Sequence, residues 1–347
     1  MIGKRIAQAR KSASLSLRAL GDLVGVSQTT ISKYEKGLST PDSTILMKLA
    51  KALGVKSSFF FRTNSYQLEN IEYRKRDIPN KVLNSINAKI LNLVEKRFEL
   101  EELYPMAISK PFQIPNGLSK KINYLYEIED IANQVRKAWS LGEDPIADLS
   151  DILELQGIKV FMIDGNIENE FDGLTAWVND NPIIVISKIW SGVRQRFTLA
   201  HELGHLILKG RLGLDLDEER ASNRFAGAFL LPQKALIDRL GNKRKSIEIA
   251  ELALLKEEFG VSMQVGFIRA NQLKIISYEY SSTLRKLFKQ NGWDTKEPTP
   301  PYPTENVKRF KQLVLRAVSQ GVISEAKGAE LLDMTVRRFY KYRMTGK

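Results

Sequence analysis

The sequence of 347 residues contains no cysteine and only two histidines. The absence of cysteine excludes a disulfide framework, a zinc site built on thiolates, an iron–sulfur cluster and a thiol nucleophile. No run of about 18 apolar residues occurs, so we expect no membrane-spanning helix. The first residues, MIGKRIAQARKSASL, lack the apolar stretch of a secretory signal. We therefore expect a cytoplasmic protein.

Positive charge is concentrated at the two ends of the chain. Residues 1–65 hold eleven basic and three acidic residues, and residues 304–347 hold ten and four, within a total net charge of +13. The long segment between them is close to neutral. Basic ends of this kind are typical of modules that bind a polyanion. A surface whose charge serves only solubility would give the same excess of basic residues.

Residues 2–62 show the pattern of a compact helical bundle. Apolar residues recur at helical spacing over about 17–24, and Gly25 ends that helix. Ser27 is a good N-cap for the next helix, which holds Ile31. Two helices joined by a tight turn at glycine make a helix-turn-helix.

The run LRALGDLVGVSQTTISKYEKG makes this pattern specific. It resembles the phage-repressor (XRE-type) family, whose pattern the first 60 residues fit without a gap. The resemblance implies that the helix after the turn enters the major groove of double-stranded operator DNA, where Gln28, Thr29 and Lys33 face base edges. Ser27 and Thr30 would contact phosphates or stay on the helix surface.

Two further properties follow from this resemblance. Arg10 and Glu35 match a pair that forms an internal salt bridge in the family. Helix-turn-helix domains of this kind usually bind operators with two-fold symmetry as dimers, so a homodimer is expected. The alternative is a small helical bundle that plays no role in DNA binding.

The middle of the chain predicts helices around one small sheet. Residues 80–103 form a long helical pattern with a polar face, which suits a rigid arm or a packing surface, including one for a dimer partner. Three short β-branched runs, 158–162, 174–178 and 183–186, are typical of strands. The expected fold class is therefore mainly α with a small β-sheet (α+β).

Both histidines fall in one motif, within WSGVRQRFTLAHELGHLILKG. His201 and His205 lie four residues apart on a predicted helix, so their imidazoles project from the same side and can bind one metal ion. Glu202 lies beside them and can accept a proton from water. This is the H-E-x-x-H motif of zinc proteases. The alternative is a pair of satisfied core histidines on an amphipathic helix.

A catalytic zinc ion needs a third protein ligand if water is to take the fourth position. With no cysteine and no further histidine, that ligand must be a carboxylate. The helix expected to start near Asp217 offers Glu218 and Glu219. The two glutamates flank its apolar stripe at nearly equal angles, so periodicity does not choose between them.

The run RFTLAHELGHLIL, followed by ExxxNRFAGAFLLP, resembles the ImmA/IrrE-type metallopeptidase family over about residues 120–240. The third zinc ligand of that family is the glutamate four residues before the asparagine of the second motif. Carried over to Asn223, this implies Glu219. The resemblance also implies zinc-dependent peptide hydrolysis with Glu202 as the catalytic base. One place for an extended substrate is the sheet edge at residues 174–178.

The C-terminal region begins with a proline-rich stretch at 298–303 that predicts a linker. The segment ISEAKGAELLDMTVRRFYKYR again has a helix-turn-helix pattern, with Arg337, Arg338, Lys341 and Arg343 after the break. It is either a second DNA- or protein-binding head or, as we favour, a basic helical cap on the peptidase domain.

These patterns predict four parts: a helix-turn-helix DNA-binding domain (1–65), a linker with a long helix (66–118), a zinc metallopeptidase domain (119–280) and a basic helical region (281–347). The expected function is a DNA-binding transcriptional regulator with an endopeptidase domain that cleaves a repressor or a toxin–antitoxin partner, in phage, mobile-element or stress control. One alternative is a non-catalytic transcription factor or antitoxin whose zinc site is structural or senses metal. Another is a housekeeping zinc protease whose helix-turn-helix binds only protein.

Overall fold

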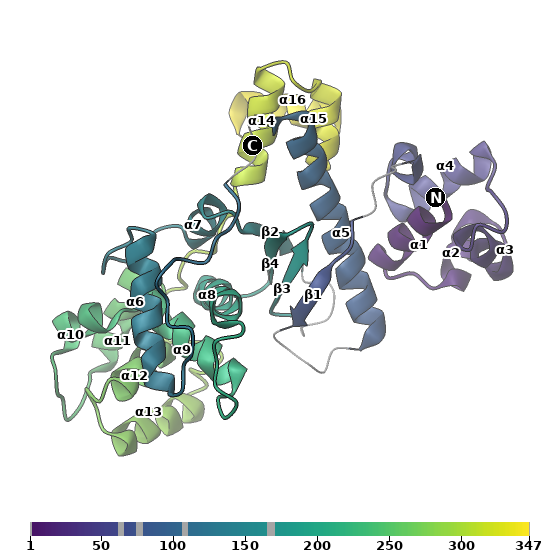
Figure 1. Ribbon diagram of the computed structural model, residues 1–347. Helices are drawn as coiled ribbons and strands as arrows, with labels where there is room; N and C mark the ends of the chain where they lie inside the picture. Colours follow the sequence, from purple (N-terminus) through teal and green to yellow (C-terminus); the bar gives the residue numbers. More distant parts are fainter. Residues whose placement is uncertain (1, 62–65, 74–78, 106–109, 165–170, 347) are drawn as a thin grey trace.

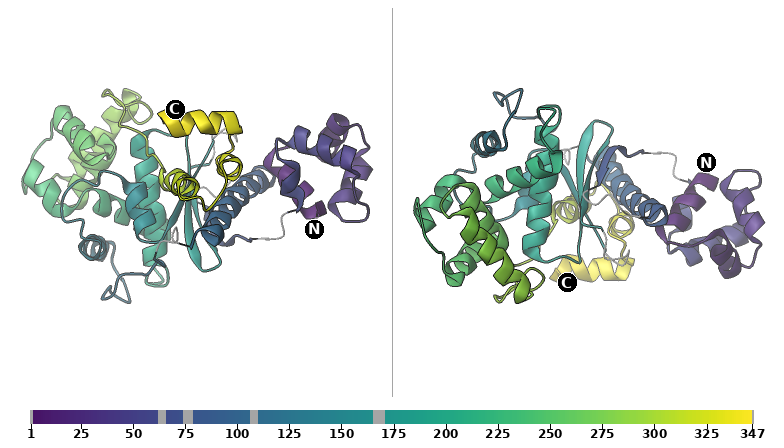
Figure 2. Two further views of the ribbon diagram at one scale, coloured as in Figure 1. Left: turned by 90° about the horizontal axis from the view of Figure 1, so that it is seen from above. Right: turned by 90° about the horizontal axis from the view of Figure 1, so that it is seen from below.

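The computed structural model describes residues 2–61, 66–73, 79–105, 110–164 and 171–346. It confirms the expected fold class, since the chain is mainly helical and has one small mixed sheet (Figure 1). A helical head at the N-terminus, a sheet with its flanking helices, and a C-terminal group of helices are arranged around the long helix α5 (Asn80–Leu103) (Figures 1 and 2). Among the described residues, no helix has the length and apolar character that a membrane span requires.

The N-terminal head is a bundle of helices around one small core. Its elements are α1 (Ile2–Ser12), α2 (Leu17–Val24), α3 (Gln28–Glu35), α4 (Ser43–Leu53) and the 3-10 helix η1 (Ser57–Phe61). Gly25 adopts a left-handed φ of 80° between α2 and α3, which confirms the predicted turn. The turn packs closely on α2, because a Cβ atom at Gly21 would lie 2.6 Å from the carbonyl oxygen of Val26.

The sheet has four strands in the order β1-β3-β4-β2. The strands are β1 (Glu69–Tyr73), β2 (Lys159–Ile163), β3 (Gly173–Val178) and β4 (Asn181–Ser187). β3 pairs antiparallel with both β1 and β4, and β4 pairs parallel with β2. The last three of these strands match the three predicted runs to within a few residues.

Both faces of the sheet are covered, because side chains alternate along each strand. On β4, Ile183 and Val185 pack towards α5, whereas Ile184 and Ile186 join the larger core on the opposite face. Figure 1 shows the sheet between α5 on one side and α8 (Gly192–Leu208) on the other. The long helix therefore serves as an intramolecular packing surface.

The larger core is almost entirely helical. Besides α8 it contains the 3-10 helix η3 (Leu125–Glu127), α6 (Ile128–Ala138), α7 (Leu149–Leu155), α9 (Glu218–Leu230), α10 (Gln233–Leu240), α11 (Ile249–Phe259), α12 (Met263–Gln272) and α13 (Tyr278–Gln290). α9 lies against both α8 and α6. This core holds α8 and α9 side by side, and those two helices carry the predicted metal ligands.

The C-terminal helices differ from our expectation in their location. They are α14 (Arg309–Ser319), α15 (Glu325–Leu331) and α16 (Val336–Thr345). Their core packs on Leu100 and Tyr104 at the end of α5, and not on the larger core. The reason is that the last turns of α5 extend beyond the sheet and present apolar side chains there (Figure 1).

The polar stretch after the N-terminal head also differs from expectation. We expected residues 66–118 to form a linker with one long helix, but residues 69–73 form strand β1 at the edge of the sheet. Residues 62–65 and 74–78 of the same stretch lie outside the described residues. The proline-rich stretch has no helix or strand, and it leads into the buried Glu305, which pairs with Arg196 of α8 at 2.8 Å.

A buried ionic cluster connects three helices of the larger core. Glu129 on α6 lies between Arg269 of α12 and Arg224 of α9, and Arg269 Nη2 donates to Glu129 Oε2 at 2.8 Å. Burial alone would raise the pKa of Glu129, but the two guanidinium groups outweigh it and hold that pKa below its ordinary value. The carboxylate is therefore ionised wherever the protein is folded at neutral pH.

Replacing Glu129 by glutamine should lower the free energy of unfolding by about 3–5 kcal/mol near neutral pH, because it leaves buried guanidinium groups without a counter-charge. A depressed folded-state pKa stabilises the protein above the unfolded pKa of about 4.3, and this contribution disappears as the pH falls through the folded value. Urea unfolding near neutral pH and at about pH 3 should show that the difference between wild type and variant shrinks in acid. A constant difference would contradict this role, and Glu257→Gln, at an exposed carboxylate on α11, is the control.

Candidate metal centre and DNA-reading helix

Helix α8 presents its two histidines on one face. His201 and His205 are one turn apart, and both side chains are buried. Their Nε2 atoms lie 3.0 Å from each other, so the two rings converge instead of occupying separate apolar surroundings. This convergence is not typical of two unrelated core histidines, which would turn their nitrogens towards separate partners.

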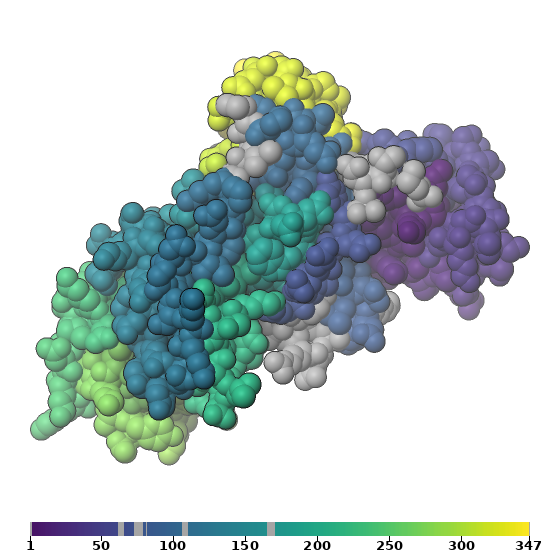
Figure 3. All heavy atoms as spheres, viewed as in Figure 1, coloured from purple at the N-terminus to yellow at the C-terminus, as the bar shows by residue number. Residues whose placement is uncertain are grey.

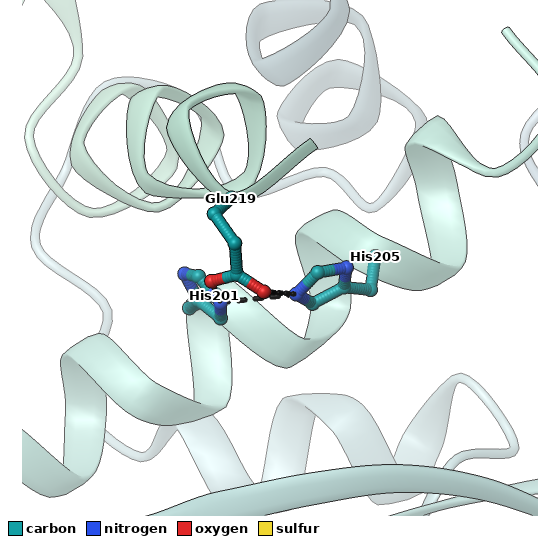
Figure 4. A group of neighbouring side chains, drawn as sticks. All are labelled: His201, His205 and Glu219. Carbon is teal, nitrogen blue, oxygen red and sulfur yellow. Dashed lines mark hydrogen bonds and ion pairs between the residues drawn. The ribbon is translucent and has the colours of Figure 1, made fainter. Parts of the chain in front are cut away.

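Glu219, in the first turn of α9, completes the group. Its carboxylate oxygens lie 3.4 Å from His201 Nε2 and 3.7 Å from His205 Nε2. Figure 4 shows the carboxylate over the gap between the two rings. One ligand atom from each residue lies within 4.8 Å of the other two. Two imidazole nitrogens and a carboxylate oxygen are donors that zinc accepts, so these residues fit the ion that the motif implies.

The other ring nitrogens are held by neighbours on α9. His201 Nδ1 lies 3.0 Å from Asn223 Oδ1, and His205 Nδ1 lies 3.1 Å from Glu218 Oε1. When Nδ1–H donates to an oxygen, the lone pair of the imidazole is on Nε2, where a metal ion needs it. The structure thus separates the two glutamates that periodicity left equal: Glu219 faces the Nε2 atoms and Glu218 faces an Nδ1 atom.

Two glycines allow the elements around α8 to come close. A Cβ atom at Gly204 would lie 3.2 Å from the Cα of Ser222, so α8 and α9 pack nearly backbone to backbone at that level. A Cβ atom at Gly173 would lie 2.5 Å from Thr198 Cγ2, so β3 packs closely against a side chain of α8. Side chains at either position would push apart the elements that carry the candidate site.

Glu202, also on α8, packs against β3. It is fully buried, and Thr175 Oγ1 of β3 donates a hydrogen bond to Glu202 Oε2 at 2.7 Å. A carboxylate held in this way has a fixed orientation, because a buried acceptor with a donor in place does not rotate freely.

The edge of β3, one place that we considered for an extended substrate, is occupied by the chain itself. β1 pairs with it so that Glu72 lies opposite Thr175. The Glu72 carboxylate contacts the end of α8. It accepts a hydrogen bond from Lys209 Nζ at 2.7 Å and lies 3.8 Å from His205 Nδ1. Sequence reasoning missed this strand, because ENIEY is polar and too short to show an alternating pattern.

In the N-terminal head, α3 carries the residues expected to contact DNA. Gln28, Thr29 and Lys33 are exposed on it. Ser27 caps the helix: its Oγ accepts from Thr30 N at 3.1 Å and lies 2.8 Å from Thr30 Oγ1. The hydroxyl groups of these two residues are therefore partly engaged in shaping the first turn.

The predicted internal salt bridge of the head is present. Arg10 Nε and Nη2 donate to the two carboxylate oxygens of Glu35 at 2.6 Å and 2.9 Å. This two-point contact fixes α1 against the end of α3 and is partly shielded from water. It supports a structural role for both residues.

Comparison with protein families agrees with this architecture. Residues 6–60 match the helix-turn-helix family, and residues 153–270 match the IrrE N-terminal-like domain, a peptidase family. The chain therefore contains one segment similar to the helix-turn-helix family and one similar to the IrrE N-terminal-like domain, as both resemblances implied.

Curated relatives match a part of this chain. An uncharacterised helix-turn-helix transcriptional regulator of Sinorhizobium fredii is 33% identical over 23% of this chain and 54% of its own length. Repressor protein C2 of Salmonella phage P22 is 33% identical over 23% of this chain and 36% of its own, and repressor protein C of Escherichia phage P2 is 39% identical over 18% and 65%. The chain thus spans roughly a third to two thirds of these relatives.

Among solved structures, Bacillus thuringiensis PlcR in complex with the peptide PapR7 and DNA aligns with 99% of this chain and 97% of that chain. The identity is 12% and the TM-score is 0.17, which is too low for a comparison of folds.

Two neighbouring glutamates allow a sharp test of the ligand set. Glu219→Gln should remove bound zinc, because an amide is a much poorer zinc ligand than a carboxylate. Glu218→Gln should keep the zinc but weaken its affinity by about 10–100-fold, the usual effect of losing a partner of a ligating histidine. Metal analysis after dialysis and titration with a competing chelator measure both values. Loss of zinc from the Glu218 variant alone would reverse the assignment.

Proposed function

We propose that this protein is a transcription regulator whose IrrE-like domain is a zinc-dependent endopeptidase. The observation that carries the proposal is the convergence of His201, His205 and Glu219 on one point, in a chain that also presents an exposed recognition helix. Three protein donors leave a fourth tetrahedral position for water or substrate, as catalytic zinc sites do. A structural zinc site would call for a fourth protein ligand instead.

In this proposal His201, His205 and Glu219 hold the ion. When bound, zinc acts as a Lewis acid towards a peptide carbonyl and allows water to be activated near neutral pH. Glu202 accepts the proton of the attacking water and passes it to the leaving amine. Thr175 fixes the Glu202 carboxylate through its hydrogen bond, so little reorientation is needed when a substrate arrives.

The DNA-binding half of the proposal rests on α3. Gln28 can contact adenine through two hydrogen bonds, Lys33 can reach guanine, and the methyl group of Thr29 can meet a thymine methyl. We propose that two copies of the chain bind a two-fold operator in the cytoplasm, and that the substrate is a regulatory protein such as a repressor, a toxin or an antitoxin. The similarity of part of this chain to two phage repressors supports this setting.

The sharpest test of the peptidase is Glu202→Gln. With zinc present, the wild type should produce new peptide ends in a proteome-derived peptide library, and the variant should do so about 10²–10⁴-fold more slowly, the usual contribution of an acid–base catalyst. Zinc content and DNA affinity should stay at the wild-type level. Mass spectrometry of the library gives the rate, and Glu257→Gln serves as the matched control. Equal rates for wild type and variant would disprove the catalytic role.

A specific observation also bears on whether the site is open. β1 covers the β3 edge directly above the Thr175–Glu202 contact, and it runs antiparallel to β3. Extended peptides commonly bind by adding a strand to a free sheet edge. We propose that the peptidase is latent in this conformation and acts only in the fraction of molecules in which β1 has left β3, so that the wild type cleaves slowly.

A proline at Glu72 tests this latency, because it removes a backbone donor and the side chain that contacts Lys209. Glu72→Pro should speed amide hydrogen exchange along β3 and raise the rate of library cleavage about tenfold or more. Gln67→Pro, just before the strand, should change neither. Faster exchange with unchanged cleavage would contradict latency, and a complete lack of cleavage despite bound zinc would favour the non-catalytic metal sensor.

A further inference from the structure

The three C-terminal helices form a separate lobe with its own core. Val314, Ala317, Ala329 and Phe339 are fully buried within it, and the lobe is joined to the end of α5. Figure 3 shows it projecting beyond the sheet and the larger helical core. The metal centre does not use this lobe, so its presence calls for another explanation.

The last two helices reproduce the turn of the N-terminal head. Ser324 caps α15 by accepting from Lys327 N at 3.2 Å, and Ser16 caps α2 by accepting from Ala19 N at 3.0 Å. A left-handed residue follows each of these helices, Asp333 with φ 55° and Gly25 with φ 80°. The spacing from the cap to the left-handed residue is the same in both segments.

The start of the second helix is also equivalent. Thr335 caps α16 by accepting from Arg338 N at 3.2 Å, two residues after the left-handed residue, just as Ser27 caps α3. One side chain of each second helix is fully buried, Phe339 in α16 and Ile31 in α3, and the two occupy the same position. The lobe is thus a second helix-turn-helix in geometry, with α16 in the place of the recognition helix.

A glycine allows the last two helices of the lobe, α15 and α16, to pack closely. A Cβ atom at Gly328 on α15 would lie 2.8 Å from the ring of Phe339 and 2.7 Å from Val318 of α14. Gly21 has a similar role in the head, where the turn approaches α2. Close packing of the first helix on the second fixes the angle at which a recognition helix is presented.

The outer face of α16 is strongly basic. Arg337, Arg338 and Lys341 are exposed, and within the part of the chain that the structure describes none of them takes part in an ion pair. Arg337 and Lys341 stand where Thr29 and Lys33 stand on α3. An exposed arginine at such a position can bind guanine through two hydrogen bonds, and both cations can pair with phosphates.

The acidic side chains of the lobe do not neutralise this face. Glu325 pairs with Arg343, Glu330 pairs with Lys327, and Asp333 pairs with Lys96 of α5. Each carboxylate is therefore already compensated, and the charge of the outer face remains positive. Residues 304–347 accordingly carry six more basic than acidic residues.

We propose that α15 and α16 form a second head that binds double-stranded DNA, with α16 in the major groove. A single chain then carries two DNA-reading helices mounted on one scaffold, since α1 and the lobe both pair with α5 through Glu95, Lys96 and Glu99. The chain therefore contacts a second DNA segment next to the one read by α3, and its footprint is longer than one half-site.

The test uses the full chain and a pool of duplexes with a randomised centre. Duplexes selected by the wild type should show two conserved segments and a long footprint. Arg337→Ala combined with Lys341→Ala should erase one segment, shorten the footprint, and reduce the slope of log affinity against log salt by about 2, roughly one for each lost phosphate contact. Gln28→Ala combined with Lys33→Ala should erase the other segment.

A matched control separates local charge from overall charge. Arg285 and Lys289 on α13 are exposed and have the same residue types and spacing as Arg337 and Lys341, so their double alanine variant should keep the wild-type footprint and slope. The second head is disproved if the α16 variant selects the same duplexes, protects the same footprint and shows the same salt dependence as this control, while the α3 variant loses binding. Loss of binding by neither variant would overturn DNA binding by both heads.

Discussion

The close approach of α8 and α9 at Gly204 is the constraint on which the candidate site depends. A ligand oxygen on one helix and two ligand nitrogens on the other must come within about 2 Å of a single zinc ion. Larger side chains between the helices would hold them several ångströms further apart, whereas Gly204 lets them meet near Ser222. The ring of Phe225 on α9 also packs against Gly204. The convergence of the candidate ligands is thus a consequence of helix packing, and the histidine spacing alone would not supply it.

Helix α5 has a comparable role at the scale of the whole chain. Arg97 on α5 bridges Glu101 at 2.7 Å and Glu154 of α7 at 3.0 Å, and Lys159 of β2 pairs with Glu101 at 3.2 Å. Buried ion pairs add little net stability, because desolvation offsets their attraction, but they penalise every arrangement that separates them. The cluster therefore fixes the orientation of α5 on the sheet. The N-terminal head and the C-terminal lobe both contact α5, so their positions depend on that orientation.

The local pattern of the sequence predicted what is local in the structure. The bounds of α5, the cap at Ser27, and the shared face of the two histidines all follow from neighbouring residues. Periodicity could not separate Glu218 from Glu219, because the difference lies in which nitrogen of a distant ring each one meets.

The missed features are non-local. β1 is a strand only because the β3 edge offers unpaired backbone groups to a polar segment about a hundred residues away in the chain. The position of the C-terminal lobe likewise depends on the exposed end of α5, and no property of residues 309–345 alone reveals it. Both required the tertiary arrangement, which propensity and spacing do not encode.

The connection between the head and β1 links the two halves of the protein. Only residues 62–68 separate η1 from β1, and about seven residues span at most about 25 Å. The head is held on α5 by the contact of Arg5 with Glu95. If the proposed DNA binding draws the head away from α5 by more than this length, β1 must leave the edge of β3. Because linkage is reciprocal, a peptide that displaces β1 would in turn shift the affinity of the head for that DNA.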